Sequence, residues 1–233
     1  GFEHFMMKEI HEQPKAVQDT LSSVVKDGQI DLSEIGLTDE NIQDIDQIYI
    51  IACGSAYHVG MAAQYVFEDL ADIPVRVELA SEFRYRKMPL NQKALVIVVS
   101  QSGETADTLA ALRMAKEKNI TTMAIVNVVG SSIAREADKV FYTLAGPEIS
   151  VATTKAYSAQ LAAMYCSSQK SEERFQKNST AITFPRCLPS RIKCRKSWKI
   201  KNGSSGLLPN MQTHMMYSSW AAALIMQSAW KEA

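Results

Sequence analysis

Short apolar runs alternate with helical patterns along the first 166 residues. Four runs end in small or polar residues, as buried parallel strands do, and lie at residues 48–52, 94–99, 122–128 and 140–144. A fifth run, at residues 75–79, alternates more and predicts a strand nearer an edge. Apolar positions recur at helical spacing over residues 55–70, 104–118 and 153–165, after a polar, helix-compatible lead at 4–32. This order predicts an α/β fold, in which helices cover both faces of a parallel sheet.

Ligands of such folds bind beyond the carboxyl ends of the strands, which draws attention to three loops. The first contains Cys53, Gly54 and Ser55, and its glycine allows a sharp turn. The second, residues 100–105, places three hydroxyls, a carboxamide and a glycine between a strand and a helix, as suits a phosphate monoester. The third, residues 146–155, is rich in hydroxyls and leads into the last helix. The first loop is a weak signal alone, and ordinary capping of a helix start is an alternative explanation for the second and third loops.

Composition excludes several classes of protein and divides the chain into two unlike parts. The 233 residues have 46% hydrophobic and 21% charged residues, which fits one or two globular domains and excludes collagen, disorder and a disulfide scaffold. No run is long enough to span a membrane, and the start lacks the pattern of a signal peptide. Residues 167–233 hold 11 Lys and Arg against 3 Asp and Glu, a net charge of +8, and the preceding residues carry −8.

Four cysteines, at 53, 166, 187 and 194, show no CxxC pairing, so their spacing predicts free thiols in a reducing compartment, with no metal site. Arg84, Arg86 and Lys87 form a basic cluster that either steers an anionic ligand or is a solvated face, and we favour the face. The histidines His4, His11 and His58 are expected to have structural roles.

Residues 1 to about 166 resemble the glucosamine-6-phosphate synthase family, the isomerising glutamine:fructose-6-phosphate aminotransferases. The resemblance rests on the segments FEHFMMKEIHEQP, CGSAYHVG, ASEFRYR, SQSGETADT and AGPEISVATTKAYS. It implies a glutaminase domain followed by two sugar-isomerase (SIS) domains, each a flavodoxin-like three-layer αβα sandwich, which make glucosamine-6-phosphate from fructose-6-phosphate and ammonia. Within this chain we expect a helical linker at 1–44, the first SIS domain at 45–166, and a tail at 167–233.

The resemblance also implies the residues that contact the substrate. Phosphate would be held by Ser100, Gln101, Ser102 and Thr105, and the sugar would contact the loop of Cys53, Gly54 and Ser55 together with Val151 and Thr153. Where the family usually has Thr-Ser after Cys-Gly, this chain has Ser55-Ala56, so the sugar contact at Ala56 is in doubt.

The catalytic base, the ring-opening histidine and the Schiff-base lysine of the family lie in the second SIS domain and at the far C-terminus. We therefore expect no catalytic residue here and do not assign that role to Lys155. The chain is expected to bind sugar phosphate, fructose-6-phosphate or glucosamine-6-phosphate, more readily than it catalyses.

The resemblance implies two partners, a glutaminase domain in the intact protein and a possible second copy of the chain. It also implies a cytoplasmic location, and we expect no cofactor and no binding to nucleic acid or membrane. A second hypothesis is a non-catalytic SIS-domain sensor of sugar phosphates. Such a regulator would carry a DNA-binding helix-turn-helix before the domain, whereas the lead here matches the synthase linker.

The basic tail has two explanations, an arm that binds nucleic acid or an anionic surface, and translation out of frame. Met and Trp have single codons, so reading one frame over forces several residues, among them Asp at 215–216, Val at 216–217, Gly at 220–221, Ala at 226–227 and Glu at 230–231. Permissible codons then turn residues 211–233 into ANAHDVFFLGRGLDYAISMEGS, which resembles the opening of the family's second SIS domain. We therefore expect the chain to leave the synthase frame near Cys166 or Ser167, through a mutation or a sequencing error, with a disordered or poorly structured tail and a shortened last helix.

Overall fold

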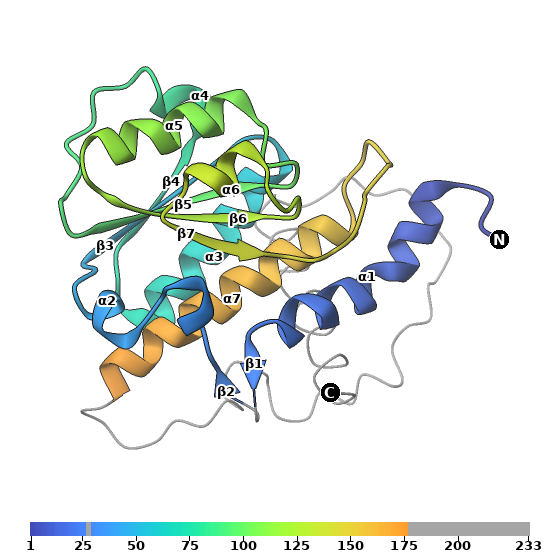
Figure 1. Ribbon diagram of the computed structural model, residues 1–233, viewed down its shortest axis with the longest axis horizontal. Coiled ribbons are helices and arrows are strands. Elements are labelled where there is room, and N and C mark those ends of the chain that lie inside the picture. Colours follow the sequence, from blue (N-terminus) through green and yellow to red (C-terminus); the bar gives the residue numbers. More distant parts are fainter. Residues whose placement is uncertain (27–28, 177–233) are drawn as a thin grey trace, which may run out of the picture.

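A five-stranded parallel sheet lies at the centre of the computed structural model, which describes residues 1–26 and 29–176 (Figure 1). Its spatial order is β4-β3-β5-β6-β7, and every neighbouring pair is parallel. The strands are β3 (Gln47–Ala52), β4 (Val75–Leu79), β5 (Ala94–Ser100), β6 (Thr121–Val126) and β7 (Lys139–Tyr142). All five predicted strands are therefore present, and β4 is an edge strand, as its alternating pattern indicated.

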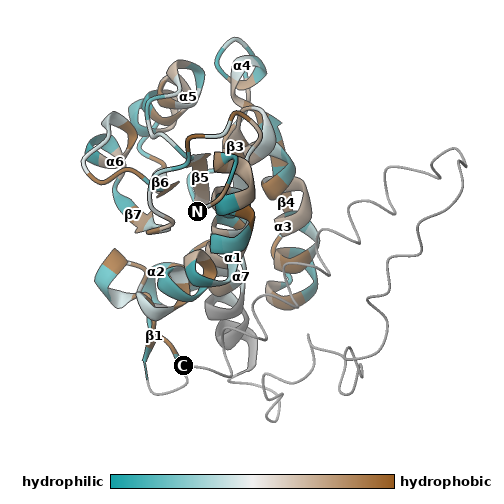
Figure 2. Ribbon diagram, turned by 90° about the vertical axis from the view of Figure 1, so that its right-hand side faces the viewer, coloured by the Kyte–Doolittle hydropathy of each residue, from teal (hydrophilic) through white to brown (hydrophobic). Residues whose placement is uncertain are grey.

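Helices cover both faces of the sheet, which confirms the three-layer αβα sandwich (Figure 2). One layer contains α1 (Phe5–Ser22), α3 (Ser55–Ala71) and α7 (Lys155–Gln176). The other contains α4 (Ala80–Phe83), α5 (Ala106–Glu117) and α6 (Ser132–Glu136). Helix α1 packs along α7, so the first and the last helix of the described chain lie side by side.

The core divides into two parts because successive side chains of a strand point to opposite faces of the sheet. Ile48 and Ile50 of β3 pack in the layer of α3 and α7, whereas Tyr49 and Ile51 pack in the layer of α5. All seven residues of the central strand β5 are buried. Burial on both faces explains why this strand reads as the unbroken apolar run ALVIVVS.

Several short elements have too few residues for a periodic pattern and were not predicted. Between α1 and β3 the chain forms β1 (Val25–Lys26) paired antiparallel with β2 (Gln29–Ile30), the 3₁₀ turn η1 (Ser33–Ile35) and α2 (Asp39–Gln43). The start of α2 is fixed locally, since Thr38 Oγ1 accepts a hydrogen bond from the Asn41 amide at 3.4 Å. The lead is therefore helical only as far as Ser22.

The last helix is longer than predicted and runs to Gln176 instead of ending near residue 165. Ser167, Ser168 and Ser171 are buried in its extension. Their hydroxyls donate to the carbonyls of Ala163, Tyr165 and Ser167 at 2.9, 2.8 and 3.0 Å. Buried serines that satisfy their own hydroxyls continue the helix without apolar residues, which the pattern could not reveal. The expectations for residues 177–233 lie outside the described residues.

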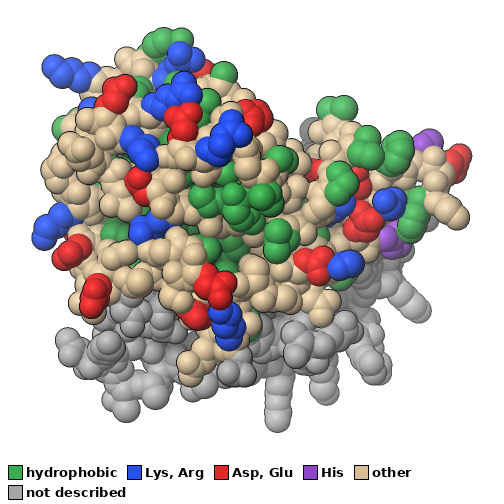
Figure 3. Space-filling view, viewed as in Figure 1, with side chains coloured by type: hydrophobic (Ala, Val, Ile, Leu, Met, Phe, Trp, Pro, Cys, Tyr) green, Lys and Arg blue, Asp and Glu red, His purple; other side chains and the backbone are tan. Residues whose placement is uncertain are grey.

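The first half of α1 and the residues before it carry exposed apolar side chains, whereas the second half is packed. Phe2, Phe5, Met6, Met7 and Ile10 are all more than a third exposed. Figure 3 shows hydrophobic side chains gathered on this projecting part of the molecule, beside histidine side chains. Among the described helices, none is long and apolar enough to cross a membrane.

Candidate functional site

The loops after β3 and β5 lie side by side at the switch point of the sheet, where the order of successive strands reverses. Ala52 at the end of β3 pairs with Val99, one residue before the end of β5. The chain leaves β3 through α3 in one layer and leaves β5 through α5 in the other. In doubly wound sheets this switch point is where ligands bind, because the diverging helices leave a crevice between the strand ends. Two of the three sequence-predicted loops thus meet at the expected edge.

The loop after β5 is a tight turn organised by its own hydroxyls. Ser100 is buried, and its Oγ accepts a hydrogen bond from the Gly103 amide at 3.0 Å and lies 3.0 Å from Thr105 Oγ1. Ser102 Oγ accepts from the Glu104 amide at 3.2 Å and is exposed. The oxygens of Ser100 and Ser102 therefore satisfy amides of the turn itself, at Gly103 and Glu104, and not amides of α5, which begins at Ala106 without a side-chain cap. The Ser102 hydroxyl keeps a proton to donate to a ligand, and of the hydroxyls of Ser100 and Thr105 one donates to the other and the second keeps its proton.

Gly103 allows this turn to press against the β6–α6 connection. Its φ is +66°, a left-handed conformation, and an added Cβ would lie 2.0 Å from Ser131 Oγ. Within the described part of the chain, Ser131 Oγ is buried without a hydrogen-bond partner. The Gly103 carbonyl accepts from the Ile133 amide at 3.0 Å. Glycine is required here by both conformation and space.

Glu104 ties the same turn to the start of α6. Its Oε1 accepts a hydrogen bond from the Ser132 amide at 2.8 Å. The hydrogen bonding to Ser132 holds the pKa of the Glu104 carboxyl below its usual value. The acidic side chain in the SQSGETADT segment is thus engaged by the protein, and the hydroxyls beside it remain the groups available to an anion.

Helix α5 begins immediately after this turn, with Thr105 at its N-cap position. The 12 residues of α5 direct unpaired amides and the positive end of the helix dipole toward the strand ends. Hydroxyl donors combined with a helix N-terminus form the kind of cradle that holds phosphate. Gln101 is half-buried in the turn, and its carbonyl accepts from the Asn127 amide at 3.2 Å.

The loop after β3 turns at Gly54, whose φ is +58°. Gly54 and Ser55 are exposed at the start of α3, whereas Ala56 is buried. Cys53 is half-buried, and its Sγ lies 3.9 Å from Thr108 Oγ1, which can donate to it from α5. This contact links the two strand-end loops and fits the interpretation of Cys53 as a small strand-end residue.

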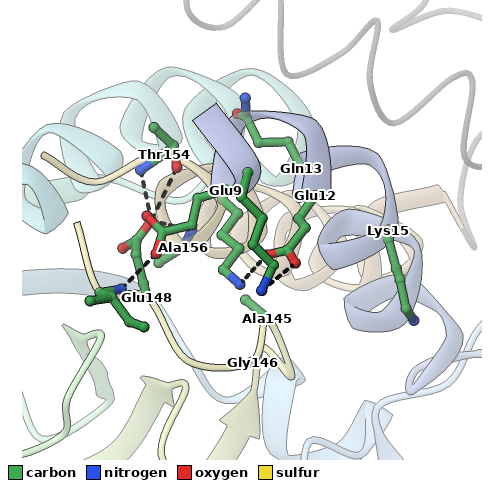
Figure 4. A network of polar contacts seen from close by, with 12 residues as sticks. Glu9, Glu12, Gln13, Lys15, Ala145, Gly146, Glu148, Thr154 and Ala156 are labelled. Atoms are coloured by element: carbon green, nitrogen blue, oxygen red, sulfur yellow. Dashed lines mark hydrogen bonds and ion pairs between the residues drawn. The ribbon is translucent and has the colours of Figure 1, made fainter. Parts of the chain in front are cut away.

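The third loop precedes α7 and is shaped by a carboxylate. Glu148 accepts hydrogen bonds from Thr153 Oγ1 at 2.9 Å, from the Thr154 amide at 2.7 Å and from the Ala156 amide at 3.3 Å (Figure 4). Val151 lies on the surface, with a relative exposure of 106%. The Thr153 hydroxyl therefore serves the helix start, and the exposed backbone around Val151 is what this loop offers to a ligand.

Asn127, which sequence reasoning missed, joins the third loop to the turn after β5. Its amide donates to the Gln101 carbonyl at 3.2 Å, and its Nδ2 donates to the Gly146 carbonyl at 2.7 Å. Its Oδ1 accepts from the Ala145 amide at 2.8 Å. A single asparagine at the end of β6 thus fixes the two loops relative to each other. An asparagine just after a strand run was its only sequence signal.

Two residues of the basic cluster and two of the three histidines make contacts of a structural kind. Arg84 pairs with Asp107 at 2.7 Å and Arg86 with Glu78 at 3.1 Å, which fits a solvated face. His11 stacks on Phe2 with ring centroids 5.2 Å apart, and His58 lies edge-on to Tyr57.

Cys53 and Cys166 are free thiols, and the other two cysteines lie outside the described residues. Burial raises the pKa of the Cys166 thiol to about 12, so this group is an inert part of the core. The described residues hold no group of three His, Cys, Asp or Glu side chains arranged for a metal ion.

Comparison with known proteins gives one family and several relatives. The model of the SIS domain matches residues 41–167. The glutamine–fructose-6-phosphate aminotransferase (isomerizing) of Caldanaerobacter subterraneus subsp. tengcongensis is 58% identical over 166 residues, which are 71% of this chain and 27% of that protein. The chain thus spans about a quarter of the length of this relative.

Two solved structures are similar to this fold. The C-terminal domain of glucosamine-fructose-6-phosphate aminotransferase from Francisella tularensis has a TM-score of 0.72 at 43% identity, over 78% of this chain and 50% of that one. The sugar isomerase domain of the RpiR transcription factor from Sphaerobacter thermophilus has a TM-score of 0.55 at 18% identity, over 73% and 96% of the two chains. The second likeness is one of fold alone.

Proposed function

The chain belongs to the SIS-domain family, and we propose that it is the fructose-6-phosphate-binding part of an aminotransferase that makes glucosamine-6-phosphate. The observation that carries this proposal is the turn of residues 100–105, which stands at the switch point of the sheet and leads into α5. Its hydroxyls and the helix N-terminus suit a phosphate monoester. The 58% identical relative, named for an activity on fructose-6-phosphate, supplies the substrate class.

In this proposal the residues of the chain bind and orient the substrate. Ser100, Gln101, Ser102 and Thr105 hold the phosphate, the loop of Cys53, Gly54 and Ser55 contacts the sugar, and so do Val151 and Thr153. Proton transfer and Schiff-base chemistry belong to groups that the resemblance places elsewhere, so this chain alone is expected to be inactive. The glutaminase domain, a second copy of the chain and a cytoplasmic location are parts of the same proposal.

Lys155 is engaged in a way that supports its exclusion from Schiff-base chemistry. Its Nζ lies 2.7 Å from Glu12 Oε2, and its side chain is 5% exposed. An amine must reach the substrate carbonyl before it can form an imine. The Lys155 amine is buried and directed at Glu12 on α1, so Lys155 has a structural role in this proposal.

The alternative, a non-catalytic sensor of sugar phosphates, has the same fold. The likeness to the transcription-factor domain is at 18% identity and says nothing of function. The 43% identical structure and the 58% identical relative both bear the name of the aminotransferase, which favours the enzyme fragment.

Calorimetric titration with fructose-6-phosphate tests the phosphate turn. We expect Ser102→Ala combined with Thr105→Ala to weaken binding by at least about tenfold, because two donors to a charged phosphate are lost. The matched control is Ser22→Ala combined with Thr121→Ala, which also removes one serine and one threonine hydroxyl. Both control positions are exposed and lie away from the turn, on α1 and at the opposite end of the sheet. Equal heats from the wild type and the Ser102/Thr105 variant would rule out this assignment of the turn.

The reading-frame expectation concerns the coding DNA and remains a prediction. We expect the genomic DNA, resequenced across codons 157–177, to contain a base gained or lost relative to this reading. Such a change would restore the continuous synthase frame and place a second SIS domain after this one. An unchanged DNA sequence would instead make residues 167–233 the true translation product and count against a sequencing error.

A further inference from the structure

A buried carboxylate on α1 holds the third loop, although α1 lies outside the residues that the family model matches. Glu9 is 2% exposed. Its Oε1 accepts a hydrogen bond from the Ile149 amide at 2.6 Å, and both of its oxygens lie 3.3 Å from the Ser150 amide. The model of the SIS domain begins at residue 41, so the partner of this loop comes from the preceding segment.

Two carboxylates therefore hold the loop, one on each side of Val151. Glu9 binds the amides of Ile149 and Ser150, which precede Val151, and Glu148 binds the Thr154 amide, which follows it. Val151 and Ala152 are exposed between these two anchors. The path of the exposed backbone is thus set by Glu9 and Glu148 together (Figure 4).

Further contacts fix where α1 lies along α7. Glu12, one turn after Glu9, binds Lys155, and Ser158 Oγ donates to Gln13 Oε1 at 2.7 Å. Residues three and four apart lie on the same side of a helix, so Glu9, Glu12 and Gln13 form one polar face. This face places Glu9 opposite the loop and leaves it little freedom to slide.

Glu9 is ionised in this position. Burial opposes its charge, but the hydrogen bonds from Ile149 and Ser150 outweigh burial and hold the pKa of the Glu9 carboxyl below its usual value. Two amide donors directed at one carboxylate make charge-assisted hydrogen bonds, which are stronger than those between neutral groups.

We propose that Glu9 is a positioning residue for sugar-phosphate binding, which holds the backbone of residues 149–150 so that Val151 and Thr153 meet the sugar. This inference rests on the proposed function, because it assigns a role within the same site. Glu9 itself is not expected to touch the substrate. The phosphate turn at residues 100–105 contains none of its hydrogen-bond partners, so the two parts of the site can be tested separately.

The test compares Glu9→Gln with the wild type as full chains, by titration with fructose-6-phosphate and with inorganic phosphate. We expect fructose-6-phosphate to bind about tenfold more weakly, because an amide group replaces an anion and turns a donor toward the loop amides. Binding of inorganic phosphate should stay within about twofold, because the turn of residues 100–105 is unaffected. The control is Asp19→Asn, which removes a carboxylate of the same helix that pairs with Lys15 and not with the loop.

Hydrogen exchange of residues 146–154 gives a readout that does not depend on ligand. We expect the Ile149 and Ser150 amides to exchange at least about tenfold faster in Glu9→Gln and at the wild-type rate in Asp19→Asn. Suppose that Glu9→Gln binds fructose-6-phosphate as well as the wild type does, while Ser102→Ala combined with Thr105→Ala weakens binding. That result overturns the role of Glu9 and leaves the proposed function standing. Equal weakening of both ligands also overturns it, and a wild-type chain that binds neither ligand overturns it together with the proposed function.

Discussion

Gly103→Ala is expected to lower the free energy of unfolding by about 2 to 4 kcal/mol, through left-handed strain and overpacking together. The φ of +66° disfavours any residue with a Cβ, and the new Cβ would lie 2.0 Å from Ser131 Oγ. Neither strain can relax without moving the turn, because the carbonyl of residue 103 is bound to the Ile133 amide. Phosphate binding should fall more than about tenfold, since displaced donors lose their alignment. Urea unfolding and calorimetric titration measure the two effects.

Ser131→Gly separates the two sources of strain. It removes both Ser131 atoms that the new Cβ would meet, Oγ at 2.0 Å and Cβ at 2.5 Å. In the double variant, we expect the loss of stability to be about 1 to 3 kcal/mol smaller than the sum of the losses in Gly103→Ala and Ser131→Gly measured separately. The backbone strain at residue 103 remains in the double variant. A Gly103→Ala protein with wild-type stability would contradict the close approach of the turn to Ser131.

Phe67→Ala is expected to cost about 3 to 5 kcal/mol, the usual range for truncation of a buried aromatic side chain. Phe67 is 1% exposed and packs in the core between α3, the sheet and α7. Domains of this size are stable by only about 5 to 15 kcal/mol, so much of the population would unfold at moderate urea concentrations. The midpoint of urea unfolding, with its slope, measures the loss.

Tyr65→Ala provides the matched control on the same helix. Tyr65 lies two residues away on α3 and is 62% exposed, so its truncation should change stability by no more than about 0.5 kcal/mol. A loss at Tyr65 as large as the loss at Phe67 would mean that the exposed side of α3 is buried in the protein in solution.

The central strands were predictable because burial on both faces leaves an unmistakable signal. The run ALVIVVS is short, rich in β-branched residues and apolar throughout, which is typical of a strand in the middle of a sheet, and it forms β5. The four residues of α4 and the five of α6 are shorter than two helical turns, so no apolar period could indicate them. Helix α7 continues beyond its predicted end through buried serines, such as Ser167 and Ser171, whose hydroxyls donate to carbonyls four residues earlier. A search for apolar positions does not detect such an extension.

The candidate site was predictable where its chemistry is local and unpredictable where it is not. The turn of residues 100–105 combines its functional groups within six positions after a strand, so sequence alone pointed to it. Glu148 caps a helix that begins seven residues later, through a loop whose path no pattern records. Glu9 acts on amides 140 residues away, and such a contact follows only from the packing of α1 on α7.

That same contact determines the order in which the domain can be completed during synthesis. Glu9 meets Ile149 across 140 residues, and Gln13 meets Ser158 across 145. At about 5 to 20 residues per second, the ribosome needs on the order of ten seconds to make the intervening chain. Contacts that close such long loops form late in folding, because the chain loses conformational entropy before the contact begins to stabilise it. Helix α1 is synthesised first and is therefore expected to be the last helix to pack against the rest of the domain.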